Sequence, residues 1–155
     1  ILQKLSVQHN FNIVLLTNIF NKCLMASDIH RGVTFIVQRK IDLLQPKHCQ
    51  RCEPISEASK DLFGKKVSEF SSQEYLDRVM GDNAIILNSE GITLAVHAAM
   101  ATDPTTQVIS IPGTGSRHLS AQKVTKETDA LAFVVSEDGP ITVFLDGEVV
   151  FRVGE

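Results

Sequence analysis

The stretch that decides the fold runs from Gly113 to Gly147 and reads GTGSRHLSAQKVTKETDALAFVVSEDGPITVFLDG. A glycine-rich turn opens it, and a helix-compatible run follows at 119–124. Two apolar runs, 130–135 and 141–145, come next, each ended by a turn that contains Asp and Gly. The pattern predicts a helix and then three core strands joined by tight turns.

Residues suited to ligand binding stand before the helix-compatible run and directly after the first apolar run. Gly113 and Gly115 let the backbone approach a ligand closely, and free N–H groups at the start of a helix favour an anion. Arg117 adds a fixed fork of donors that suits phosphate. Ser136 and Glu137 end the apolar run. The sequence therefore predicts a phosphate-binding turn that leads to a core strand with a carboxylate at its far end.

These motifs resemble the signature of the diadenylate cyclase domain, the catalytic domain of the DNA-integrity scanning proteins and their relatives. The matching residues are Gly115-Ser116-Arg117-His118-Leu119, Thr128-Asp129-Ala130-Leu131, Val135-Ser136-Glu137 and Asp82-Asn83-Ala84. They agree with the family in order and spacing over the signature region 81–147. Residues 1–80 resemble it only in general character.

Outside the signature region, hydrophobic periodicity predicts the remaining elements. We expect a helix over 11–26, a first strand over 33–37 and a strand or loop over 63–70. Ser71 and Glu74 fit a capping box for a helix from 72 to about 79. Further strands are expected at 84–87, 92–96 and 108–111. The expected fold is one α/β domain over 1–155, with a mixed, mostly antiparallel sheet flanked by helices on both sides.

The resemblance implies a reaction between two ATP molecules, each bound with Mg²⁺ or Mn²⁺ by one protomer of a face-to-face homodimer or higher oligomer. The 3′-hydroxyl of each ATP attacks the α-phosphate of the other, and cyclic di-AMP and two pyrophosphates form. Asp82 would help the 3′-hydroxyl lose its proton and would share the metal with Glu137. The implied ATP-binding residues are Asn83, Ala84, Gly115, Ser116, Arg117, His118, Leu119 and Ser136; Asp82, Arg117 and His118 are the implied catalytic ones.

The sequence departs from the family pattern at two positions of this site. Asn83 stands where the family has Gly; Asn is the side-chain-bearing residue that best tolerates a positive φ, so the same turn stays accessible. Leu119 stands where the family has a second Arg, and losing one charge-assisted contact costs roughly 1.5–3 kcal/mol. On a helix, Lys123 would share the face of Leu119 and could replace that charge.

These departures leave a binding function open beside catalysis. A degenerate domain would hold ATP or cyclic di-AMP as a sensor or partner subunit without turnover. The retained Asp82, Arg117, His118 and Glu137 favour the enzyme, because a pure binder has little need for the acid. A nucleic-acid-binding or purely structural module is disfavoured by the net charge of −3 and by scattered basic residues.

Composition agrees with a soluble globular domain, with 155 residues of which 43% are hydrophobic and 21% charged. No apolar run approaches the ~20 residues of a membrane helix. The most apolar early segment, 13–25, contains Asn and Lys and lacks the features of a signal peptide. We therefore expect no membrane or nucleic-acid binding by this domain and a cytoplasmic location.

Cys49 and Cys52 form a Cys-x-x-Cys pair beside His48. This spacing is half of a zinc site and is also a redox spacing. A structural zinc needs four ligands, and no second pair follows. A surface loop with two thiols is the favoured interpretation, and a metal or redox role is the alternative.

Overall fold

Strand β1, Val33–Val37, is the centre of the fold. It pairs in parallel with β3, Ala84–Leu87, and antiparallel with β5, Leu131–Val135. All five residues of β5 are buried, which explains why this strand reads as a continuous apolar run rather than an alternating one. The computed structural model describes residues 1–51, 57–62, 64–79 and 83–154.

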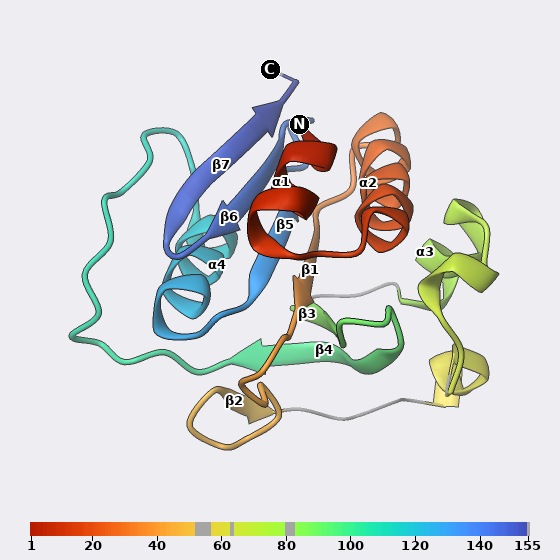
Figure 1. Cartoon of the computed structure of the whole chain (residues 1–155), viewed down its shortest axis with the longest axis horizontal. Coiled ribbons are helices and arrows are strands. Elements are labelled where there is room, and N and C mark those ends of the chain that lie inside the picture. The colour runs from red at the N-terminus through yellow and green to blue at the C-terminus, as the bar shows by residue number, and fades with distance from the viewer. Residues whose placement is uncertain (52–56, 63, 80–82, 155) are drawn as a thin grey trace.

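Within these residues the sheet has seven strands in the order β2-β4-β3-β1-β5-β6-β7 (Figure 1). Apart from β1 with β3, every neighbouring pair in this sheet is antiparallel. The other strands are β2 (Cys49–Arg51), β4 (Thr93–Met100), β6 (Ile141–Leu145) and β7 (Glu148–Val153). The helices are α1 (Leu2–His9), α2 (Ile13–Asp28), α3 (Ser72–Arg78) and α4 (Ser116–Glu127), with short 3-10 turns at Glu57–Leu62 and Val67–Glu69.

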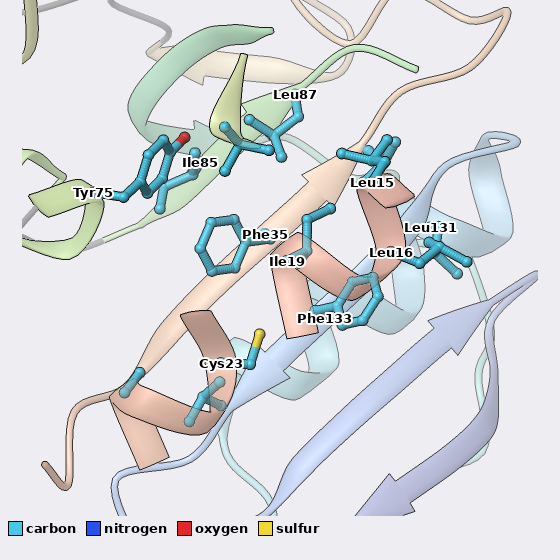
Figure 2. Close-up of a cluster of buried hydrophobic side chains, with 14 of the residues drawn as sticks. Leu15, Leu16, Ile19, Cys23, Phe35, Tyr75, Ile85, Leu87, Leu131 and Phe133 are labelled. Atoms are coloured by element: carbon cyan, nitrogen blue, oxygen red, sulfur yellow. The ribbon is translucent and has the colours of Figure 1, made fainter. Parts of the chain in front are cut away.

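Helices cover both faces of the sheet, as the sequence predicts. On one face, α1, α2 and α3 enclose the larger apolar core, in which Leu16 and Ile19 of α2 lie with Phe35 and Phe133 of the sheet (Figure 2). On the other face, α4 packs Ala121 and Val124 against a second core. The alternation of side chains along β1 and β5 supplies both cores from the same strands.

Several expected elements match the structure closely. The strands at Val33–Val37, Ala84–Leu87 and Ile141–Leu145 have the expected bounds. The capping box of α3 is also present, because the Ser71 hydroxyl accepts from the Glu74 backbone N–H while the Glu74 carboxylate accepts from the Ser71 N–H.

The helix expected over 11–26 is confirmed as α2, Ile13–Asp28, with both bounds two residues later, whereas the preceding helix α1 was not located from the sequence. Two helices form, and Asn10 between them has a left-handed backbone with φ of 58°. The Asn12 side chain then caps α2 by accepting from the backbone N–H groups of Val14 and Leu15. A side-chain cap of this kind starts a new helix.

The expected strand at 108–111 is also absent from the structure. This segment belongs to the connection between β4 and α4, and Ile109 is exposed. Its Ile109 carbonyl accepts from the Gln122 side chain of α4, and its Ile111 carbonyl accepts from the Thr114 hydroxyl. Directly before the segment, Lys126 donates to Gln107 O. The described part of the expected strand or loop at 63–70 contains a 3-10 turn.

The loop expected around Cys49 is instead the edge strand β2. Cys49 pairs with Met100, is buried and donates through Sγ to Arg51 O at 3.1 Å. Cys52 lies outside the described residues. None of the helices among the described residues has both the length and the apolar character needed to cross a lipid bilayer.

Tyr75 gives a test of the larger core. Its hydroxyl lies 2.5 Å from Thr93 Oγ1 in a fully buried pair that joins α3 to β4. Tyr75→Phe leaves the Thr93 hydroxyl without this partner, so we expect a loss of about 1–3 kcal/mol in the free energy of unfolding by urea. Tyr75→Phe with Thr93→Val should recover most of that loss. A double variant as unstable as the two single losses combined would contradict this account.

Candidate functional site

The ends of four neighbouring strands lie side by side, and this row of strand ends forms the edge of the sheet at which the site lies. Ala98, Ala84, Thr34 and Val134 form one register row across β4, β3, β1 and β5. Because β5 runs antiparallel to β1, its C-terminal end lies at the start of β1. The residues that follow β5, Ser136 and Glu137, are thereby brought to the same edge as Thr34 and Ala84.

The N-terminus of α4 opens at this edge. Gly113 has a positive φ of 81°, and Gly115 is the N-cap with an extended backbone. Gly115 has no side chain, so the first N–H groups of α4 receive no side-chain cap. The N–H groups of the first helical turn and the positive end of the helix dipole together favour an anion here.

A cleft of about 640 Å³ lies between α4 and the sheet edge. This volume is in the usual range for small-molecule and cofactor sites. The cleft is lined by Thr34, Ile36, Asn83, Ala84, Ala98, Ala99, Met100, Gly113, Thr114, Gly115, Ser116, Arg117, His118, Ser120, Ala121, Ser136, Glu137 and Asp138. The predicted phosphate turn, the Ser-Glu pair and the Asn83-Ala84 pair thus lie around one cavity although they are far apart in the sequence.

Arg117 supplies the main positive charge of the cleft. Among the described residues, none forms an ion pair or hydrogen bond with its guanidinium. An unpaired guanidinium keeps all its donors available for an anion.

His118 and Thr34 are buried polar residues of the cleft with unused hydrogen-bonding atoms. Each residue is 5% exposed, and within the described part of the chain neither His118 Nε2 nor Thr34 Oγ1 has a hydrogen-bond partner. The His118 ring packs edge-on against Phe144. Burial lowers the pKa of His118 below its usual value, and the charges of Arg152 and Arg117 add to this effect. The imidazole is thus favoured in its neutral form, and its Nε2 atom can form a hydrogen bond with a ligand.

Asn83 adopts the unusual backbone that the sequence predicts. Its φ is 74°, and it lines the cleft directly before Ala84 of β3. Asp82, the residue predicted to take the proton of the 3′-hydroxyl, lies outside the described residues, so its role stays a prediction.

Leu119 is 40% exposed and is not among the residues that line the cleft. Lys123 does not line it either. The geometry therefore gives no support to Lys123 as a replacement for the missing family Arg.

The donor set suits a metal that is shared with a ligand. Glu137 contributes one carboxylate to the cleft next to Ser136, and the described residues contain no group of three or more His, Cys, Asp or Glu side chains placed to hold an ion. Mg²⁺ is commonly bound through one or two carboxylates together with substrate phosphates. Glu137 beside a phosphate-binding turn fits that arrangement.

Several cleft residues were missed by the sequence analysis, namely Thr34, Ile36, residues 98–100, Ser120, Ala121 and Asp138. The strand residues among them are small or apolar and read as ordinary strand positions. Only the register between β1, β3 and β4 brings them to the cleft. Ser120 carried a weak signal, since it lies one helical turn after Ser116.

Comparison with known proteins places the chain among nucleotide-binding domains. A family model described as DAC, the DisA bacterial checkpoint controller nucleotide-binding domain, matches residues 22–149. A diadenylate cyclase from Methanocaldococcus jannaschii is 38% identical over 73 residues, which are 46% of this chain and 23% of that protein. A diadenylate cyclase from Haloferax volcanii is 28% identical over 74 residues, 46% of this chain and 27% of that protein. The matched part is thus about a quarter of each curated relative.

Two solved structures share the fold. A hypothetical membrane spanning protein from Bacillus cereus superimposes with a TM-score of 0.63 and 19% identity, over 90% of this chain and 63% of that one. A double mutant of DacA from Staphylococcus aureus gives a TM-score of 0.61 and 20% identity, over 89% of this chain and 85% of that one. At these identities the likeness concerns the fold alone.

The lowered pKa of His118 predicts a pH-dependent stability. The unfolded chain binds a proton near pH 6.5, the usual pKa of His, whereas the folded chain resists it. Stability from this group is therefore complete above about pH 6.5 and is lost as the pH falls below that value. We expect the Tm of His118→Gln to fall less between pH 7.5 and pH 5.5 than the Tm of the wild type. An equal fall in both proteins would contradict the prediction.

Proposed function

Because the chain belongs to the DAC family of DisA-type nucleotide-binding domains, we propose that it is a diadenylate cyclase. It would join two ATP molecules into cyclic di-AMP with release of two pyrophosphates. ATP as substrate also agrees with the cytoplasmic location expected from the sequence.

The single observation that carries this proposal is the composition of the cleft. The N-terminus of α4, the Arg117 guanidinium, which pairs with none of the described residues, and the Glu137 carboxylate surround one cavity. Arg117 and the helix N–H groups suit the phosphates, while Glu137 suits a phosphate-bound cation. A site that bound a neutral ligand would have no need of this combination.

The reaction needs two nucleotide sites that face each other. One P–O bond forms between the 3′-oxygen of each ATP and the α-phosphorus of the other, and one α–β phosphoanhydride bond breaks in each. One cleft of about 640 Å³ in this chain holds one triphosphate in the proposal, so a second copy of the chain supplies the second ATP. Catalysis then rests on positioning and on stabilisation of charge.

Each group of the cleft has a defined task in this proposal. The N–H groups after Gly115, the Ser116 hydroxyl and the Arg117 guanidinium bind phosphate oxygens, with Ser136 close by. Neutral His118 donates or accepts one hydrogen bond at Nε2, the atom for which the described residues provide no partner. Asp82 accepts the proton of the attacking 3′-hydroxyl.

Asp82 and Glu137 would hold Mg²⁺ or Mn²⁺ together with the phosphates. When bound, this ion neutralises negative charge on the triphosphate.

The second candidate is a domain that binds ATP or cyclic di-AMP without turnover. Asn83 favours it, since this residue places an amide in the cleft where the family has Gly. Leu119 also favours it, because it adds no charge there.

Incubation with ATP and Mn²⁺, followed by mass spectrometry for cyclic di-AMP, tests the proposed function. We expect product from the wild type and none from Asp82→Asn or Glu137→Gln. Arg117→Ala removes a charge-assisted contact of about 1.5–3 kcal/mol, so kcat/KM should fall about 10- to 100-fold. Arg31→Ala removes a cation outside the cleft and serves as the matched control. Retention of ATP without product, unaffected by Asp82→Asn, would support the binding domain instead.

A reaction between two protomers predicts a dependence on protein concentration. Dilution should lower the activity per protomer once the concentration falls below the dissociation constant of the dimer. Initial rates measured over a hundredfold dilution series, with sedimentation velocity at the same concentrations, check this. Rates strictly proportional to protein across a range in which the chain is monomeric would contradict turnover by two facing copies.

A further inference from the structure

Gly32 lies directly against the Arg117 guanidinium. It stands between α2 and β1, and a Cβ atom added there would lie 2.6 Å from Arg117 Cζ and 2.8 Å from Nη2, and closer still to Nη1. Real Cβ atoms essentially never approach other heavy atoms to less than 3.0 Å. The Arg117 side chain therefore occupies the space that any larger residue at position 32 would need.

The backbone of Gly32 has no need of glycine for its own sake. It is not among the residues with a positive φ, so alanine fits the same backbone conformation. The absence of a side chain at position 32 therefore makes space for the Arg117 guanidinium and is not required by the backbone conformation.

The position of Gly32 directs Arg117 toward the ligand side of the cleft. Gly32 directly precedes Val33, which pairs with Val135, and Ser136 and Glu137 directly follow Val135. Arg117 thus extends from the first turn of α4 to the junction of β1 and β5. Since no ion pair or hydrogen bond from another described residue holds the guanidinium, contact with the Gly32 backbone restricts where it lies.

We propose that Gly32 is a positioning residue for nucleotide binding, acting through Arg117. Because Gly32 has no side chain, it leaves room for the Arg117 guanidinium beside Ser136 and Glu137. The guanidinium is thereby kept where a triphosphate would be bound. A side chain at position 32 displaces the guanidinium while the fold is kept. This inference rests on the proposed function, because the anion that Arg117 meets is taken to be the phosphate chain of ATP.

The test compares Gly32→Ala with the wild type by isothermal titration calorimetry with ATP and by initial-rate kinetics. We expect ATP binding about tenfold weaker, with a Tm close to that of the wild type. Arg117→Ala should show a loss of similar size, and Gly32→Ala should add nothing further in that background, where the guanidinium is gone. Such non-additivity identifies two residues that act through one contact.

Further variants separate positioning from a general effect on the loop. Arg31→Ala changes the neighbouring residue, which does not line the cleft, and should bind ATP like the wild type. Arg117→Lys has a slimmer end group, so Gly32→Ala should weaken ATP binding less in that background than in the wild type. If Gly32→Ala lowers the Tm, the same change in the Arg117→Ala background should not, because the clash is then absent.

The outcomes distinguish this inference from the proposed function. Unchanged ATP affinity and kcat/KM in Gly32→Ala, in a wild type that binds ATP, would overturn the role of Gly32 alone. Losses from Gly32→Ala and Arg117→Ala that multiply would also overturn it. A wild type that binds no ATP would reject the proposed function and the role of Gly32 together.

Discussion

The parallel pairing of β1 with β3 is the constraint on which the rest of the structure depends. A parallel pair requires a long crossover connection, and here the chain leaves β1, forms β2 and α3, and returns beside it. The pairing puts the first residues of both strands, Thr34 and Ala84, at the same edge of the sheet. The antiparallel strand β5 ends at that edge. The C-terminal residues of β4, which line the cleft, lie at the same edge. Without this register, the polar segments of the chain would lie at opposite ends of the sheet.

Much of the central fold was predictable because local signals and burial agree. Strands such as Val33–Val37 are apolar and β-branched, and they are buried in the centre of the sheet. The left-handed backbone at Asn83 was also predictable, since its residue type tolerates that conformation. For the site, the sequence predicted a turn and a carboxylate around one ligand, and the described residues among them do line one cleft.

The rest could not be read from the sequence because it depends on distant partners. The 108–111 segment has strand-forming residues, but its Ile109 carbonyl and the neighbouring Gln107 carbonyl accept from side chains of α4. The break between α1 and α2 rests on a side-chain cap at Asn12 that hydrophobic periodicity alone does not reveal. The cleft residues contributed by β4 and the contact between Gly32 and Arg117 follow from register and packing alone.

Helix α4 is fixed at the end that lies away from the cleft. Thr125 accepts a hydrogen bond from the backbone N–H of Gly147 at 3.2 Å and donates to Ala121 O at 2.9 Å, and a Cβ at Gly147 would clash with the Lys126 side chain. The helix is therefore held to the β6–β7 turn by contacts within the chain that do not involve the cleft. An anion arriving at its other end meets donors that are already aligned, so little conformational entropy is lost on capture and more of the contact energy remains as affinity.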